Sequence, residues 1–123
     1  MSEQQHDQDP RLVTAQNVWM ATVRADGRPH LVPIWFVWLE GRFYLCTGKD
    51  SVKGRNLQAN PQVVLSLEDG SKPLIAEGTA TFHAPPYRPA IIAAFQEKYD
   101  WDMSHSEQYN VVVEVTVEKW LGW

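Results

Sequence analysis

The fold of this chain is decided by residues 47–57, which read TGKDSVKGRNL. The preceding residues 42–46 are aromatic and apolar enough to form a strand, and Asn60-Pro61 is a helix stop signal. A helix of about two turns fits between this strand and that stop. The first N–H groups of such a helix have no partner within the helix and carry the positive end of the peptide dipoles. This helix start predicts a binding site for an anion, above all for a phosphate group.

The side chains of this segment support the same interpretation. Ser51 is the better N-cap, since a carboxylate at Asp50 would compete with a bound phosphate. Lys53 adds a full positive charge. Arg55 lies two positions further along and therefore points to a different side of the helix, so one phosphate should not bind both. The alternative interpretation is a capped surface helix with solvated basic side chains.

The rest of the chain predicts a mainly β protein with short helices. Apolar patterns predict strands at 17–24, 29–39, 42–47, 62–68, 74–83 and 111–120. Turn residues separate several of them, as at Asp26-Gly27. Helical spacing predicts helices at 11–16 and 86–99. Residues 1–10 are polar and acidic and predict a disordered leader, which leaves residues 11–123 as a single domain.

The second predicted strand, residues 29–39, is apolar on both faces. One face carries Val32, Ile34, Phe36 and Trp38, and the other carries Leu31, Pro33, Trp35 and Val37. A strand with one solvated face would alternate apolar and polar residues. One face therefore lines an interior, and the other meets a second subunit, a planar ligand, or both. Pro33 lacks a backbone donor, which predicts an edge or irregular position where neighbouring backbone groups contact a ligand.

Composition limits the class of protein. At 123 residues the chain forms one domain, and dimerisation would add stability. The net charge of −4 without any basic run argues against nucleic acid as the main partner. The single cysteine, Cys46, excludes an internal disulfide, and no apolar run reaches membrane-spanning length, so we predict a cytoplasmic protein without a membrane segment. The histidines do not fall at metal-ligand spacings, so no metal site is predicted.

Six tryptophans are many for a chain of this length, and Trp120 and Trp123 stand where a chain end is usually polar. Something should cover them. Together with the two-sided second strand, they predict an obligate homodimer. Trp19 and Trp101 belong to no motif, and we interpret them as packing residues.

Three segments together resemble one known family. They are residues 51–57 with Asn60-Pro61, residues 21–36, and residues 76–80. They resemble the phosphate-binding stretch, the first hairpin and the fourth-to-fifth strand region of the pyridoxamine 5'-phosphate oxidase-like flavin-binding split barrels. The resemblance covers residues 15–83. It implies a six-stranded split β-barrel that forms a homodimer, with the cofactor at the dimer interface.

The resemblance also implies the site residues. Contacts to the isoalloxazine ring are expected from Val32, Pro33, Ile34 and Trp35. Contacts on the phosphate side are expected from Thr47, Ser51, Lys53 and Asn56. Trp120 is a candidate neighbour of the cofactor, because a C-terminal aromatic packs near the ring from either subunit in this family. The alternative for Trp120 is plain core or interface packing.

Departures from the oxidase itself bear on the function. The oxidase has an arginine where Val52 stands, and it has basic positions on the second strand where this chain is apolar. Pyridoxamine phosphate oxidation is therefore not expected. The Arg55-Asn56-Leu57 and Trp35-Phe36 segments look closer to the branch that uses the deazaflavin coenzyme, whose longer tail would engage Arg55.

By this resemblance, we expect an oxidoreductase that uses FMN, or alternatively the deazaflavin coenzyme, to transfer hydride to or from a small organic substrate. A second hypothesis is a flavin- or haem-binding carrier or sensor of the same fold without turnover. A third is a cofactor-free dimeric barrel. We assign no catalytic residue, because flavin chemistry needs little from the protein beyond positioning and electrostatics.

Overall fold

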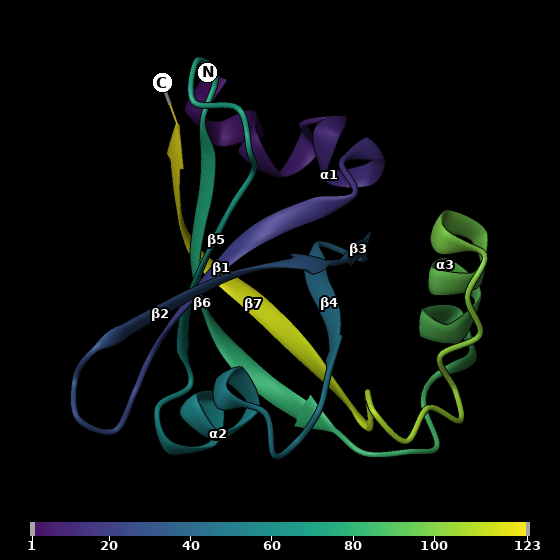
Figure 1. Cartoon of the computed structure of the whole chain (residues 1–123). Coiled ribbons are helices and arrows are strands. Elements are labelled where there is room, and N and C mark those ends of the chain that lie inside the picture. The colour runs from purple at the N-terminus through teal and green to yellow at the C-terminus, as the bar shows by residue number, and fades with distance from the viewer. Residues whose placement is uncertain (1, 123) are drawn as a thin grey trace.

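The computed structural model describes residues 2–122, with side chains from residue 5 onward. The described elements are η1 (Ser2–Gln8), α1 (Arg11–Thr14), β1 (Asn17–Val23), β2 (Pro29–Trp35), β3 (Val37–Leu39), β4 (Arg42–Thr47), α2 (Val52–Ala59), β5 (Gln62–Ser66), β6 (Leu74–His83), α3 (Pro89–Tyr99) and β7 (Val111–Gly122). The fold is mainly β, and the predicted split barrel is confirmed (Figure 1). No helix among the described residues is long and apolar enough to cross a membrane.

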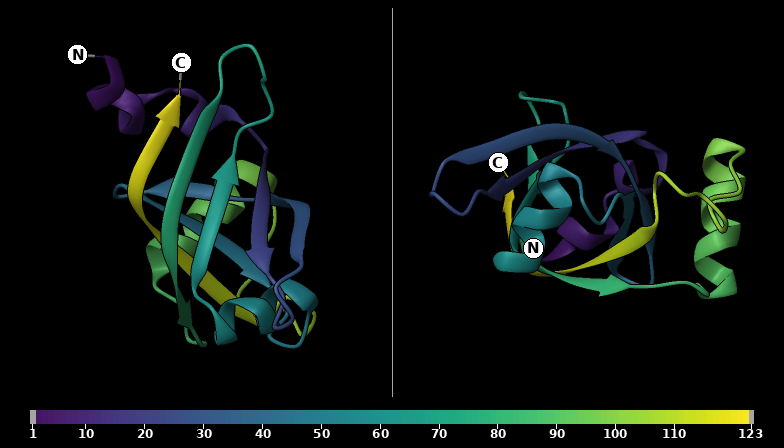
Figure 2. Two further views of the ribbon diagram at one scale, coloured as in Figure 1. Left: turned by 90° about the vertical axis from the view of Figure 1, so that its left-hand side faces the viewer. Right: turned by 60° about the horizontal axis from the view of Figure 1, so that its bottom comes forward.

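All the described strands join one antiparallel sheet in the order β2-β1-β5-β6-β7-β4-β3. Its two edge strands, β2 and β3, are consecutive in the chain and are separated only by Phe36. The sheet must therefore curl until its edges meet, and the chain itself joins one edge to the other. The views in Figure 2 show this curled sheet, with α3 standing outside it.

The prediction of one strand at residues 29–39 is wrong, and the sheet has seven strands instead of six. β2 pairs with β1 up to the Asn17–Trp35 pair, whereas β3 pairs with β4. One straight strand cannot pair with both edges of a curled sheet, so the backbone turns at Phe36. The side chain of Phe36 is fully buried, which holds this turn against the barrel interior.

Two hydrophobic cores lie on opposite faces of β4 and β7. Inside the barrel, Phe43 and Leu45 of β4 pack with Val113 and Val115 of β7. Under α3, the second core contains Tyr44, Cys46, Val112, Ile91, Phe95 and Met103. Because both faces are covered, every residue of β4 after Arg42 is buried.

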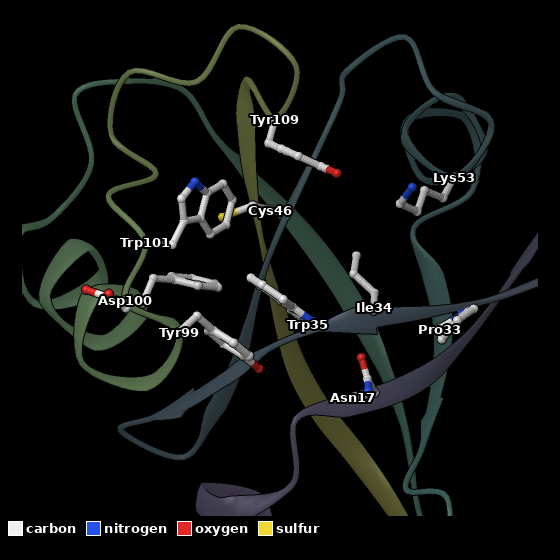
Figure 3. Close-up of a pocket in the computed structure, with 11 residues that line it drawn as sticks. Asn17, Pro33, Ile34, Trp35, Cys46, Lys53, Tyr99, Asp100, Trp101 and Tyr109 are labelled. Carbon is white, nitrogen blue, oxygen red and sulfur yellow. The ribbon is translucent and has the colours of Figure 1, made fainter.

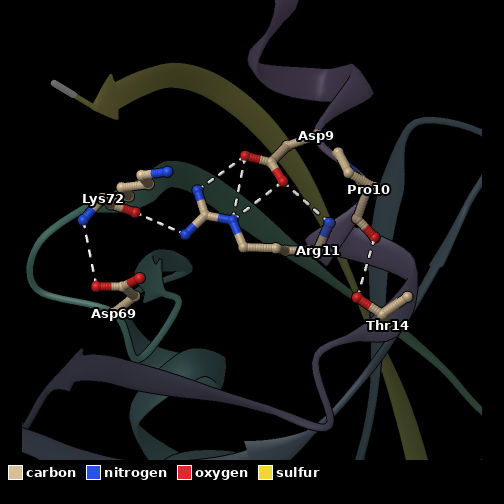
Figure 4. Close-up of polar contacts among 6 residues, drawn as sticks. All are labelled: Asp9, Pro10, Arg11, Thr14, Asp69 and Lys72. Carbon is tan, nitrogen blue, oxygen red and sulfur yellow. Dashed lines mark hydrogen bonds and ion pairs between the residues drawn. The ribbon is translucent and has the colours of Figure 1, made fainter.

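The N-terminal residues lie at one end of the barrel. The sequence predicted a disordered leader at residues 1–10, and in the structure Ser2–Gln8 form a 3-10 helix, with the His6 ring 6.2 Å from Trp120. Arg11 forms an ion pair with Asp9, with Nη2 and Oδ2 2.8 Å apart, and its Nη1 donates to the Lys72 carbonyl at 2.6 Å (Figure 4). The bond to the Lys72 carbonyl attaches α1 to the loop between β5 and β6.

The outer face of β1 and β2 is apolar and uncovered in the single chain. Leu31 is 59% exposed and Trp35 46%, and Trp19 and Val23 of β1 are also exposed. Along β2, exposed residues alternate with partly buried ones. One face of the predicted two-sided strand therefore turns toward the barrel, and the other is left largely exposed, although Tyr99 and Trp101 pack against its Trp35.

Candidate functional site

The predicted anion-binding segment forms a tightly bonded turn followed by a helix. α2 begins after Ser51, which is the N-cap as predicted, because its Oγ accepts a hydrogen bond from the Gly54 N–H at 3.1 Å. The same Oγ donates to the Gly48 carbonyl at 2.7 Å and lies 3.2 Å from Thr47 Oγ1. The hydroxyls of the turn thus shape the start of the helix.

Lys53, in the first turn of α2, is a half-buried cation that has no counter-ion among the residues the structure describes. Among the described residues, its Nζ forms no ion pair and the amides of Val52 and Lys53 bond no acceptor. Burial lowers the pKa of Lys53. Burial also lowers the pKa of nearby His30, and the charges of Arg24 and Lys53 lower it further. Positive potential therefore collects here with free donors, which suits an anion.

A cavity of about 610 Å³ opens beside Lys53 (Figure 3). Its lining comes from the strands β1, β2 and β4, from α2, and from the end of α3 with the loop that follows: Asn17, Pro33, Ile34, Trp35, Cys46, Lys53, Phe95, Tyr99, Asp100, Trp101 and Tyr109. Figure 3 shows Lys53 on one side and the aromatic side chains gathered on the other. Cavities of roughly 300–1,000 Å³ are typical of small-molecule and cofactor sites.

Aromatic side chains form the wall of the cavity away from Lys53. The Trp35 ring stacks on the Tyr99 ring, with centroids 4.3 Å apart and an interplanar angle of 5°. Trp101 meets Trp35 edge-on at 6.1 Å, and it meets Tyr109 edge-on at 5.5 Å. Such a wall presents flat apolar surface to a planar ligand.

The lining offers few groups for acid–base chemistry. Burial raises the pKa of the Cys46 thiol to about 12, so the thiol stays protonated at neutral pH and is a poor nucleophile. The Asp100 carboxylate accepts a hydrogen bond from Gln96 and points away from the other labelled side chains in Figure 3. No histidine lines this cavity, and no group of potential metal ligands gathers within residues 5–122. The lining suits a planar, anionic group that carries its own chemistry.

A second cavity, of about 430 Å³, lies against another side of α2. Arg24 and Arg28 of the hairpin between β1 and β2 line it together with Arg55 of α2. Arg28 forms an ion pair with Asp26 at 2.8 Å, whereas Arg55 forms none within the described part of the chain. Lys53 and Arg55 thus face different cavities, as their separation by two positions predicts.

The structure brings together part of the site that the sequence predicted. The main cavity is lined by Pro33, Ile34, Trp35 and Lys53. Thr47 and Ser51 lie in the turn before α2, where their hydroxyls are already hydrogen bonded. Val32 lies on β2 next to Pro33 but is not part of the lining.

Three other predicted residues lie elsewhere. Arg55 and Asn56 line the second cavity, and the buried Asn56 amide donates to Thr22 Oγ1 at 3.0 Å, which joins α2 to β1. Trp120 packs with Trp38 and Phe43 at centroid distances of 5.8 and 6.2 Å. It therefore lies on the barrel core and does not line the cavity of its own chain.

Sequence reasoning missed several residues of the cavity wall. Asn17, Tyr99 and Tyr109 were not singled out, and Trp101 was interpreted as a packing residue. The aromatic pair at 99 and 101 beside a helix end was the available signal, but it belongs to no motif. Its partner Trp35 stands far away in the sequence, so only the fold brings these rings together.

Comparisons with known proteins identify a family and similar folds. A family model described as pyridoxamine 5'-phosphate oxidase matches residues 7–123. The search of curated proteins found no match. Many solved structures have similar folds, and the three described next have identities that show the fold alone.

An F420 reductase is 23% identical with a TM-score of 0.73, and the match covers 91% of this chain and 94% of the other. The haem storage protein HutZ of Vibrio cholerae is 21% identical with a TM-score of 0.76, over 97% of this chain and 90% of the other. A FAD-binding protein of Mesorhizobium loti is 20% identical with a TM-score of 0.69, and the match covers 94% of this chain and 91% of the other. Proteins of this fold thus include flavin-type and haem proteins.

Proposed function

This chain belongs to the pyridoxamine 5'-phosphate oxidase family, and from that premise we propose that it binds FMN, or alternatively the deazaflavin coenzyme, in the cavity beside Lys53. We further propose that it is an oxidoreductase that transfers hydride to or from a small organic substrate. One observation carries the proposal: a half-buried lysine and two helix amides, none of them paired within the described part of the chain, lie at one side of a cavity whose other side is aromatic.

The residues present fit such a cofactor. Lys53 and the first amides of α2 would hold the phosphate, and Pro33, Ile34 and Trp35 would lie against the ring. The cofactor supplies the hydride chemistry when it is bound. The chain's own contribution is to orient the ring and to keep water from it with the aromatic wall.

Haem is the weaker candidate for the same cavity. Haem iron is usually held by a histidine, a methionine, a thiolate or a tyrosinate. Among the described residues, no histidine or methionine lines this cavity, the Cys46 thiol is protonated, and the Tyr99 hydroxyl is bonded to backbone groups, so an iron ligand would have to come from Tyr109. A flavin carrier without turnover remains the second candidate, because the lining holds no assigned acid or base.

Titration with the two cofactors tests this function. Wild type is expected to bind FMN or the deazaflavin coenzyme, and the change in ligand fluorescence measures this binding. Arg55→Ala should change the free energy of FMN binding by less than about 0.5 kcal/mol. It should weaken deazaflavin binding by about 1–2 kcal/mol, because the longer anionic tail would reach the second cavity with its three arginines.

Lys119→Ala, an exposed substitution on β7 that changes the net charge equally, is the matched control and should leave both affinities unchanged. Binding of neither cofactor by wild type would refute the proposed function. Reduction of the bound cofactor followed by substrate-dependent reoxidation separates an oxidoreductase from a carrier.

We also propose that the active form is a cytoplasmic homodimer formed through the outer face of β1 and β2. This face exposes Trp19, Val23, Leu31 and Trp35, and Trp35 also lines the cavity. Burial of such a contiguous apolar face against a second copy would remove it from water. The proposed contact between Trp120 and the cofactor would then come from the second copy.

Sedimentation equilibrium at low micromolar concentration is expected to show a dimer. Leu31→Glu should shift it to monomer, because a charge would be buried in the apolar contact. Val13→Glu is the control, since Val13 of α1 is similarly exposed but lies away from this face. A well-folded wild-type monomer would contradict the proposed dimer.

A further inference from the structure

Phe36, at the break between β2 and β3, depends on the end of α3 for its backbone hydrogen bonds. The residue is fully buried, so its N–H and C=O need partners. The Tyr99 hydroxyl accepts from the Phe36 N–H at 3.0 Å and lies 2.7 Å from the carbonyls of Phe36 and Gln16, to one of which it donates. Lys98 Nζ donates to the same Phe36 carbonyl at 3.0 Å.

Lys98 is held at this break without an ion pair to any carboxylate in the described part of the chain. Its Nζ lies 3.9 Å from the centroid of the Phe36 ring and 5.4 Å from that of Tyr99. Of the neighbouring acids on the chain, Glu97 is exposed and Asp100 accepts from Gln96. Burial lowers the pKa of Lys98 to about 8, so the ammonium still carries its charge at pH 7.

The same contacts determine one wall of the main cavity. The Tyr99 ring stacks flat on Trp35, the residue directly before the break. Phe95, on the buried face of α3, supports Tyr99 at a centroid distance of 6.0 Å and Trp101 at 5.9 Å. A shift of α3 would therefore move the Phe36 backbone, the Trp35 indole and Trp101 together.

We propose that Lys98 and Tyr99 are positioning residues for the ring of the bound cofactor: by holding the Phe36 backbone they fix the end of β2 and the orientation of Trp35 beside Pro33 and Ile34. This inference rests on the proposed binding function. It differs from the role of Lys53, because it concerns the ring and not the phosphate. The two ends of the cavity therefore respond to different substitutions.

Substitutions of the two residues test the inference with FMN and with riboflavin, which has no phosphate. Tyr99→Phe keeps the stacked ring but removes the hydroxyl, and Lys98→Met keeps the apolar stem but removes the donor. Each is expected to weaken FMN and riboflavin binding equally, by about three- to tenfold, because binding must then order an end of β2 that has lost one or two net hydrogen bonds. Lys98→Arg retains a charged donor and should restore the affinity to within about twofold of wild type.

A spectroscopic readout accompanies the titrations. The near-UV circular dichroism of the stacked Trp35–Tyr99 pair should weaken in Tyr99→Phe and in Lys98→Met, with Trp35→Phe as the reference for its complete loss. Lys49→Met, an exposed lysine before α2, is the control and should leave the spectrum unchanged. Thermal melts establish a temperature at which every variant is folded.

Two results would overturn the inference. The first is that folded Tyr99→Phe and Lys98→Met bind flavin as tightly as wild type. Even if their melting temperatures were lower, the contacts of Lys98 and Tyr99 with Phe36 would then only support the fold. The second is an unchanged near-UV spectrum in both variants. If wild type binds neither flavin, the proposed function fails separately, and the spectrum still decides whether Lys98 and Tyr99 orient Trp35.

Discussion

Lys53→Ala is expected to weaken FMN binding by about 1.5–3 kcal/mol, the range for a hydrogen bond to a charged group. Lys53 forms no ion pair among the described residues, so no internal bond is lost with it. The fold should therefore remain intact. Fluorescence titration with FMN measures the change in affinity, and urea unfolding measures the stability of the variant.

Riboflavin and pH provide the controls for this result. Riboflavin should be almost indifferent to Lys53→Ala because it lacks the phosphate, and Lys49→Ala in the preceding turn should change neither affinity. Burial lowers the pKa of Lys53 from its usual 10.5, so the lysine loses its charge at a lower pH than an exposed one. FMN affinity should therefore fall as pH rises through that pKa, and Lys53→Ala should lack this fall. Unchanged FMN affinity in Lys53→Ala would favour the capped surface helix without a bound anion.

Gly54→Ala is expected to destabilise the fold by about 2–3 kcal/mol and to weaken FMN binding together with it. A Cβ at this position would lie 2.7 Å from the Lys49 carbonyl oxygen and closer still to that of Gly48. Both are backbone atoms, so the methyl group can be accommodated only by moving the turn away from α2. That movement would break the hydrogen bond from the Gly54 N–H to Ser51 and shift the amides proposed to hold the phosphate.

Urea unfolding and FMN titration measure the two effects in one protein. Gly70→Ala is the matched control, because a Cβ there meets nothing within 4 Å and Gly70 lies in an exposed loop. Its stability should stay within about 0.5 kcal/mol of wild type. If Gly54→Ala matches that control, the close approach of α2 to its turn does not constrain the site.

Local patterns in the sequence predicted the start of α2 correctly. Ser51 caps the helix through a bond to an amide only three residues away, and the Asp26-Gly27 turn closes through bonds between residues 24 and 28. Such bonds join residues that are close together in the chain, so the residue types that form them can be recognised in the sequence. Even so, the close packing of Gly54 against the Gly48 carbonyl has no signature in the sequence, since glycine occurs for many reasons.

The cavity wall and the strand count depended on contacts between distant residues. Phe36 and Tyr99 are 63 positions apart, and Asn56 and Thr22 are 34 apart. An apolar run from 29 to 39 is compatible with one long strand or with two, because the apolar residues continue without interruption through Phe36. Only the closure of the sheet, with its edges meeting at that residue, distinguishes the two possibilities.

Most strand and helix positions and the N-cap at Ser51 follow from the sequence alone, because periodicity and capping act within a few neighbouring residues, whereas the break at Phe36 does not. The tertiary structure was needed to show which cavity each of Lys53 and Arg55 lines, and that Trp35, Tyr99, Trp101 and Tyr109 share one wall. These arrangements depend on which strands pair and on where α3 packs. The free energy of that packing comes from many weak contacts across the whole chain, which no single segment specifies.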